Sequence, residues 1–394
     1  MPSPMVWRGA VVAGALTAAA GIIHAGVAQR LVRSDPVAAA RVAPYDARVA
    51  MAAARKLAED GHGATDPAIR ALTQATLARD LTQNAAIEFR AVDVEAAGDR
   101  ARAAELFDLS DAISRRSLAT RLWLIQRSVD RGDVGHALRD FDIALRTTAA
   151  AAPTLFPVLA GATSDPGLVV PIARMLDRPS DWRLMFLNYA VANGDIEGAS
   201  AVLLHMRDRG MVTGNGIDRA LIARLVGERR FALAGRVRGA FSAGKAQPHL
   251  IVDGAFADAT GSYPFGWSFT ERGDIGAERS IADGRPALGW RSEPGRGGQV
   301  AAQLLLLSPG NYRLVTMAAS ATSDDAPYWS LTCGEEGGST LARLDVPSAS
   351  NAAAAVDVAV PVGCEGQWLT LTLRPGGTSG ERTGAIASVA ITRR

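Results

Sequence analysis

The chain is poor in the residues that most often carry catalysis or bind metals. It has two cysteines and five histidines among 394 residues, and aromatic residues make up only 6%. The histidines are scattered, with none at metal-ligand spacing from another. No Gly-x-Ser-x-Gly motif, which would position a nucleophilic serine, occurs in the sequence. We therefore expect no metal, no cofactor and no catalytic residue.

An excess of charge of one sign is also missing. The chain has 42 Lys and Arg against 40 Asp and Glu, which gives a net charge of +2 with both signs interspersed. Proteins that bind nucleic acid usually carry a basic face, so we expect no nucleic-acid partner. The length and the 48% hydrophobic content indicate a folded protein with more than one domain.

Residues 9–29 contain no charged side chain, and Arg8 and Arg30 flank them. A run of this length can cross a bilayer, which favours a membrane anchor or signal segment over residues 1–33. The alternative is a secretory signal, because Gly26-Val-Ala28 fits a small-x-small cleavage site. We expect a single-pass inner-membrane protein with a periplasmic body, or a protein secreted to the periplasm after cleavage. A cytoplasmic protein is the third alternative.

Residues 34–245 are rich in helix formers, and short turns that contain glycine interrupt them. Gly98 and Gly132 are 34 residues apart, and Gly194 and Gly227 are 33 residues apart. A period of this size is typical of stacked helical hairpins, in which each hairpin buries its apolar face on the next. The sequence predicts an α-solenoid over this range.

The residues that follow these turns share one pattern of small and large side chains. Alanine stands five residues after the glycine, an aromatic or large apolar residue four later, and, in two of the three sets, a small residue three later. The matching sets are Ala103, Phe107 and Ser110; Ala137, Phe141 and Ala144; and Ala199, Leu203 and Met206. In this pattern the region resembles the tetratricopeptide repeat family. The resemblance implies a concave surface that binds protein partners.

From residue 248 to residue 394 the pattern changes from helical to alternating. Leu369, Leu371 and Leu373 fall on one face of a predicted strand, whereas Trp368 and Thr370 fall on the other. We predict strands at Leu250–Phe256, Trp267–Glu271, Val300–Leu307, Asn311–Ala319, Tyr328–Cys333, Ala355–Val360, Trp368–Leu373 and Ala385–Thr392. Many short strands separated by Gly, Pro and Ser turns are typical of an antiparallel β-sandwich. The fold class is therefore α + β in separate domains.

Two motifs of this region resemble jelly-roll carbohydrate-binding modules. Asp253-Gly-Ala-Phe256 is followed by Trp267, and Pro309-Gly-Asn-Tyr312 forms a turn into a strand. The resemblance implies a jelly-roll domain that binds glycan. Together with the repeats and the N-terminal segment, the chain resembles membrane-anchored accessory proteins of bacterial exopolysaccharide systems.

The two cysteines, Cys333 and Cys364, both lie in the predicted β-domain. Two cysteines in a domain that follows an export-like segment predict a disulfide, and the alternative is a pair of buried thiols. A disulfide also favours the periplasm over the cytoplasm.

The candidate glycan-binding residues are Trp267, Trp290, Arg291 and Tyr328. Sugars stack on exposed aromatic rings, and guanidinium groups hold their hydroxyl groups. Trp267 lies in a glycine turn, Trp290 lies beside Arg291, and alternation points Tyr328 outward while Trp329 points to the core. For each tryptophan, packing in the core is the competing interpretation.

We therefore predict a non-catalytic adaptor that binds protein through its repeats and glycan through its β-sandwich. One alternative is a lyase or hydrolase whose acids lie in the β-domain, where Asp324-Asp325 and Glu335-Glu336 are acidic pairs. A second alternative is a purely structural scaffold for protein–protein contacts.

Overall fold

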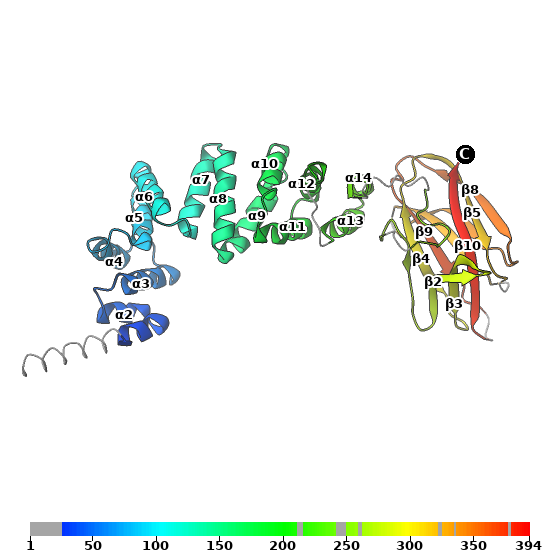
Figure 1. Ribbon diagram of the computed structural model, residues 1–394, viewed down its shortest axis with the longest axis horizontal. Coiled ribbons are helices and arrows are strands. Elements are labelled where there is room, and N and C mark those ends of the chain that lie inside the picture. Colours follow the sequence, from blue (N-terminus) through cyan, green and yellow to red (C-terminus); the bar gives the residue numbers. More distant parts are fainter. Residues whose placement is uncertain are drawn as a thin grey trace, which may run out of the picture. The chain divides into compact units, whose positions relative to one another are not determined.

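The structure of the protein is a computed structural model (Figure 1). It describes residues 26–210, 216–241, 250–258, 262–321, 325–334, 336–376 and 380–394. The chain divides into two compact units, Met1–Leu159 with Arg174–Arg183, and Ala160–Ala173 with Leu184–Arg394.

The described part of the chain up to residue 241 is helical, and the predicted helical class is correct. Its elements are α2 (Pro36–Val42), α3 (Ala47–Glu59), α4 (Pro67–Leu77), α5 (Asn84–Ala96), α6 (Arg100–Ile113), α7 (Leu118–Asp130), α8 (Val134–Thr147), η1 (Ala149–Ala151), α9 (Ala152–Ala162), α10 (Pro166–Leu176), α11 (Asp181–Asn193), α12 (Ile196–Asp208), α13 (Ile217–Gly227) and α14 (Phe231–Phe241).

The Gly-Asp turns end one helix and begin the next. Gly98 has φ +93° and Gly132 has φ +70°, a left-handed conformation that glycine adopts without strain. The next residue in each turn is an N-cap. The Asp99 carboxylate accepts from the Arg102 N–H at 3.0 Å, and the Asp133 carboxylate accepts from the His136 N–H at 3.0 Å.

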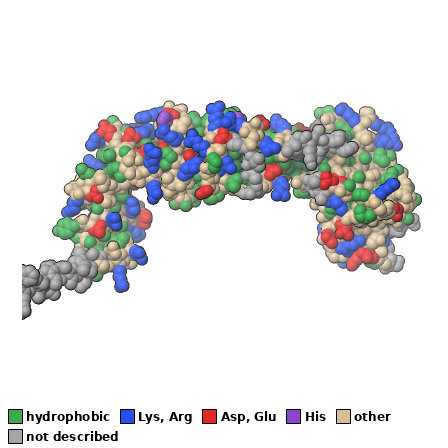
Figure 2. Space-filling model, in the orientation of Figure 1, with side chains coloured by type: hydrophobic (Ala, Val, Ile, Leu, Met, Phe, Trp, Pro, Cys, Tyr) green, Lys and Arg blue, Asp and Glu red, His purple; other side chains and the backbone are tan. Residues whose placement is uncertain are grey.

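The side chains at the predicted repeat positions are buried. Ala103 and Phe107 of α6 are 0% and 1% exposed. The matching positions of α8 and α12 are buried as well: Ala137, Phe141, Ala144, Ala199, Leu203 and Met206. Small side chains therefore lie where helices pack closely, but the assignment to the tetratricopeptide family stays a prediction. Figure 2 shows basic and acidic side chains interspersed on the visible face of the helices.

The predicted single-pass membrane protein needs correction. Among the residues that the structure describes, no helix is long and apolar enough to cross a membrane. Most of the predicted span, residues 9–25, lies outside the described residues.

The described chain from residue 250 onward forms two antiparallel sheets that make a β-sandwich, as predicted. The strands are β1 (Ser268–Phe269), β2 (Ile275–Ala282), β3 (Arg285–Ser292), β4 (Gly298–Leu305), β5 (Gly310–Ala318), β6 (Tyr328–Cys333), β7 (Ser339–Asp345), β8 (Ala353–Val360), β9 (Gln367–Leu373) and β10 (Arg382–Arg393). One sheet has the order β1-β4-β9-β6-β7 and the other the order β2-β3-β10-β5-β8. Apolar side chains of both sheets form the core between them.

The strand predicted at Leu250–Phe256 is wrong. Asp253 and Phe256 have positive φ angles of 50° and 58°, which no strand accommodates. The Asp253 carboxylate accepts from the N–H groups of Ala257 and Asp258 at 2.6 and 3.0 Å, and so closes a turn. The sequence prediction also omits β2, β3 and β7.

The β2–β3 hairpin carried a signal in the sequence. Ala282 pairs with Arg285, which leaves Asp283-Gly284 as a two-residue loop. Both loop residues have positive φ, 49° and 75°, as a type I′ turn requires. Asp-Gly is a preferred dipeptide for this turn, so the hairpin was predictable from residues 275–292.

Candidate functional site

Trp267 lies inside the sandwich. It is 7% exposed, and its ring lies 5.5 Å from both Phe256 and Trp329, measured between ring centroids. Its indole N–H donates to the Asp253 carbonyl at 3.0 Å. The ring face and the polar atom are both occupied by the protein. Trp267 is therefore placed to stabilise the turn at Asp253, and it offers no open face to a sugar.

Tyr328 points out of the core, as alternation along β6 predicts, while Trp329 is fully buried. The Tyr328 ring is nevertheless covered. The guanidinium carbon of Arg343 lies 3.6 Å from the ring centroid, and that of Arg374 lies 5.4 Å away. These cation–π contacts occupy the ring face that a sugar would need.

Trp290 and Arg291 come together with residues from the neighbouring strands β2 and β10. The strand register places Gly276, Arg291 and Thr383 in one row across β2, β3 and β10. Glu278 and Gly289 form a parallel row on the same face. Trp290, in the row between them, belongs to the core face. The outer face of this sheet therefore combines two glycines with charged and polar side chains.

A hollow lies in this face beside the two glycines, although the Ser280 side chain comes within 2.9 Å of where a Cβ of Gly289 would be. Its volume is about 230 Å³. Its lining residues are Glu271, Gly276, Ala277, Glu278, Gly289, Trp290, Arg291, Thr383 and Gly384. A Cβ added at Gly276 would meet the Thr270 carbonyl oxygen at 3.5 Å, an ordinary contact. The hollow thus depends on the absence of a side chain at position 276, where the surroundings would accommodate a Cβ.

We call this hollow, with the lining residues given above, the glycine hollow. Some of its polar groups have hydrogen-bond partners within the protein, and others do not. The Arg291 guanidinium donates to the carbonyls of Arg272 and Gly273 at 2.7 and 3.0 Å. Trp290 is 4% exposed, and its buried indole N–H has no acceptor among the described residues. Because the Trp290 side chain belongs to the core face, this N–H does not face the hollow on the outer face of the sheet.

The carboxylates proposed for the alternative enzyme do not gather at this hollow. Asp325 lies 3.8 Å from Arg382, and Glu336 accepts a hydrogen bond from Gln299. Asp324 and Glu335 lie outside the described residues. Within the described part of the chain, no group of three or more His, Cys, Asp or Glu side chains is placed to hold a metal ion.

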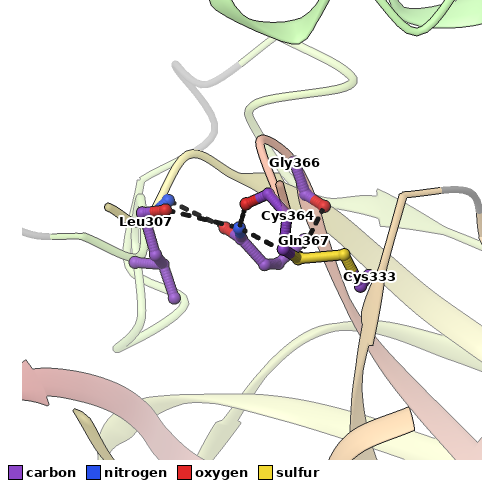
Figure 3. Close-up of a disulfide and its surroundings, with 5 residues drawn as sticks. All are labelled: Leu307, Cys333, Cys364, Gly366 and Gln367. Carbon is purple, nitrogen blue, oxygen red and sulfur yellow. Dashed lines mark hydrogen bonds between the residues drawn. A yellow bond between two sulfur atoms is a disulfide. The ribbon is translucent and has the colours of Figure 1, made fainter. Parts of the chain in front are cut away.

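The predicted disulfide is confirmed. Cys333 at the end of β6 bonds to Cys364, 31 residues later (Figure 3). Beside it, the fully buried Gln367 side chain accepts from the Leu307 N–H at 2.7 Å and donates to the Cys364 carbonyl at 2.5 Å. The bond and the amide together tie β9 to the loops that flank β4 and β6.

Sequence reasoning missed one exposed aromatic residue. Tyr263 is 52% exposed, the most exposed aromatic side chain in the described sandwich, and its ring lies 6.0 Å from that of Trp368. Partial burial and the negative charge of Glu336 raise the pKa of Tyr263 above its usual value. Tyr263 stands directly before Pro264, which indicates a turn and so an exposed side chain. The sequence does not show which residues lie beside the Tyr263 ring.

No protein-family model and no curated protein matches the chain. Solved structures similar to it include several carbohydrate-binding proteins. One is TmCBM61 in complex with β-1,4-galactotriose, with 13% identity, 36% of this chain and 92% of that chain covered, and a TM-score of 0.24. Another is a putative sugar-binding protein from Bacteroides thetaiotaomicron, with 13% identity, 37% and 100% coverage, and a TM-score of 0.26.

A third is the enzymatically active domain of bacteriophage CBA120 tailspike protein 4, with 14% identity and a TM-score of 0.27. The match covers 37% of this chain but only 21% of the tailspike chain. With such low identities and TM-scores, the ligands and activities of those proteins do not carry over to this chain.

Proposed function

We propose that the β-sandwich binds a glycan at the glycine hollow on β2, β3 and β10. The observation that carries the proposal is the hollow beside the row of Gly276, Arg291 and Thr383, whose lining includes the exposed Glu271 and Glu278. A sugar ring, which carries several hydroxyl groups, suits such a surface. Hydroxyl groups donate to carboxylates and accept from guanidinium and hydroxyl donors, and glycine in the floor lets the ring approach the backbone.

The test uses the full chain and immobilised polysaccharides. Gly276→Ala adds one methyl group to the hollow at contacts of 3.5 Å or more, so the fold should persist. We expect glycan affinity to fall about tenfold, because the added methyl group would crowd the bound ligand by an amount typical of one extra methyl group in a packed contact. Gly63→Ala is the matched control, because its Cβ would meet the Thr65 hydroxyl at 3.7 Å in the helical region.

A third variant locates the site. Tyr263→Ala removes the exposed ring that would form a stacking surface elsewhere on the sandwich. If Tyr263→Ala loses binding and Gly276→Ala keeps it, the glycan binds at Tyr263 and the hollow is the wrong site. If the wild-type chain binds no glycan in a broad panel, the proposed function fails. Turnover of a polysaccharide by the wild-type chain would favour the enzyme instead.

We propose further that the whole chain is a non-catalytic adaptor whose helices bind protein partners. A polar hollow of about 270 Å³ on α6, α7 and α8 supports it, with Arg131 and Arg139 among its lining residues. Neither guanidinium has an ion-pair partner among the described residues. A photo-crosslinker at position 131 should give one main adduct that Arg139→Glu abolishes. A merely solvated helix face would give no discrete adduct.

A role in envelope or exopolysaccharide assembly rests on the sequence resemblance. The Cys333–Cys364 bond supports the oxidising compartment that this role requires, because disulfides persist mainly outside the cytosol. Loss of exported polysaccharide on deletion of the gene, restored by the wild-type chain but not by Gly276→Ala, would connect the hollow to that role.

A further inference from the structure

One edge of the sandwich lacks the features that usually keep a sheet edge from pairing with other strands. β8 ends its sheet, where it pairs with β5 and with no second strand among the described residues (Figure 1). It has eight residues, Ala353–Val360, and its register with β5 shows no bulge. Its one charged residue is Asp357. Natural proteins usually shorten, bulge, charge or cover such an edge.

The other three edges of the two described sheets carry such protection. β1 has only two residues. β2 is covered at its start, where the Ala277 N–H donates to the Thr270 carbonyl at 3.0 Å. β7 shifts its register with β6 and carries the charged residues Arg343 and Asp345. Of the described edges, β8 is therefore the open one.

The ladder between β5 and β8 shows which backbone groups point to the open edge. Next to the last ladder pair, the Ala318 N–H donates to the Ala352 carbonyl at 3.0 Å. In an antiparallel ladder, alternate residues turn both backbone groups toward the neighbouring strand, so the even-numbered residues of β8 face β5. The odd-numbered residues turn theirs to the open edge, and no described group bonds to them there. They are Ala353, Ala355, Asp357 and Ala359.

The side chains of this edge leave room and little charge for a second strand to meet. Three of the four odd-numbered residues are alanines, and all four are exposed. Asp357 is the one carboxylate, and the Arg394 guanidinium donates to it at 2.7 Å, while that of Arg313 lies 3.7 Å away. Because its own chain compensates the charge of Asp357, a second strand can approach the backbone without strong repulsion.

The sequence of β8 is complementary to a second copy of itself in the antiparallel orientation. A pair centred on Val356 places Ala353 opposite Ala359 and Ala355 opposite Asp357. Each odd-numbered residue then meets an odd-numbered residue, so the open backbone groups of both strands bond to one another. The two carboxylates never stand directly opposite each other, which like charges on paired strands disfavour. Val356 meets its own copy on the face turned to the core.

We propose that the protein forms a two-fold dimer in which two β8 strands pair antiparallel and join their sheets into one. The partner is a second copy of this chain, and the strand order across the interface is β5-β8-β8-β5. Main-chain hydrogen bonds supply the affinity when a strand is added to a sheet edge, and the paired side chains set the register. In this register Ala355 of each copy lies opposite Asp357 of the other.

Sedimentation equilibrium of the full chain over about 1–100 µM measures the dimer. We expect the wild type to pass from monomer to dimer as its concentration rises. Ala355→Pro removes an N–H that points to the open edge and not to β5, a position where edge strands accept proline. The sandwich should therefore keep its fold, which its melting transition checks. The two-fold symmetry removes two hydrogen bonds from the interface, so the dimer should dissociate about tenfold more readily.

Charge variants at the same position test the register. Ala355→Glu places a carboxylate opposite Asp357 twice in the dimer and should weaken it about tenfold, whereas Ala355→Lys places an ammonium group there and should tighten it. Ala390→Glu is the matched control. Ala390 and Ala355 flank Val315 in one row across β10, β5 and β8, and both are exposed. Because β10 is paired on both sides, Ala390→Glu should leave the dimer unchanged.

Four results would overturn the proposal. A wild type that stays monomeric rules out self-pairing and leaves the edge to a strand of another protein. A dimer that both Ala355→Pro and Ala355→Glu leave intact forms elsewhere on the chain. Equal weakening by Ala355→Glu and Ala390→Glu places the contact on the outer face of the sheet and not at its edge. Equal weakening by Ala355→Glu and Ala355→Lys contradicts the register that sets Ala355 opposite Asp357.

Discussion

Replacement of both disulfide cysteines by alanine should destabilise the β-sandwich and leave the helices unchanged. Cys333 and Cys364 close a loop of 31 residues that contains β7 and β8. In the unfolded chain this cross-link removes conformations that the open chain would populate. The double variant Cys333→Ala, Cys364→Ala restores that freedom, so its unfolded state gains entropy and the folded state becomes relatively less stable.

The magnitude follows from the loop length. A closed loop of 31 residues corresponds to about 3.7 kcal/mol at 25 °C in the loop-entropy account. For a domain the size of this sandwich, that loss lowers the melting temperature by roughly 10 °C. Cys364 is buried, and its sulfur lies 3.5 Å from the Gln367 amide nitrogen, so loss of this contact adds a small further cost.

Calorimetry of the full chain measures the effect, and hydrogen exchange assigns it. We expect the sandwich transition to fall by about 10 °C and peptides from β6 and β9 to exchange faster, while α5–α8 peptides stay unchanged. Reductant should lower the wild-type transition and have no effect on the double variant. A double variant that melts within about 2 °C of the wild type would refute the loop-entropy reasoning.

Three further predictions concern other parts of the chain. Ala137→Leu overpacks a buried site of α8 and should cost about 1–3 kcal/mol, and an unchanged urea midpoint would disprove the repeat register. The hydrogen bond from Arg70 lowers the pKa of the buried Asp93 carboxyl. The ionised carboxylate therefore stabilises the fold fully above its ordinary pKa, and this stabilisation disappears as the pH falls through the lowered pKa. Asp93→Asn should therefore be roughly 1.5–3 kcal/mol less stable than the wild type at neutral pH, and the difference should shrink as the pH falls through the lowered pKa, as measured by urea unfolding at each pH. Gln367→Leu leaves the Leu307 N–H without its acceptor and should cost about 1–3 kcal/mol in the sandwich transition, and no loss would show that water replaces the amide.

Local pattern was sufficient for some features of the fold. Alternation in β6 places Trp329 with the core, and the structure buries it fully. The disulfide was predictable because two cysteines within one domain allow one pairing, Cys333 with Cys364. The glycine turns were predictable because glycine at Gly98 and Gly132 meets a need for positive φ that few residues share.

The candidate site depended on information that a single segment does not contain. Gly276, Arg291 and Thr383 share a row only because β3 lies between β2 and β10. Nothing in the residues around Trp290 shows that its side chain enters the core, since that depends on which face of β3 packs against the other sheet. Trp267 was misleading for a related reason: glycines beside an aromatic residue indicate a turn, but they do not show which way the ring points.

Glycine at position 276 weakens strand β2, so the hollow should lower the stability of the sandwich by an amount that can be measured. Gly276 lies in β2 with a backbone conformation open to other residues, and its added Cβ would make ordinary contacts at 3.5–3.6 Å. Alanine there restricts the unfolded chain and should stabilise the sandwich by about 0.4–1 kcal/mol. The same methyl group occupies the hollow and should weaken glycan binding. A gain in melting temperature together with a loss of affinity would mean that glycine is kept for the ligand. A loss of both would mean that the hollow is a packing requirement of the fold, and the proposed binding site would then have to be abandoned.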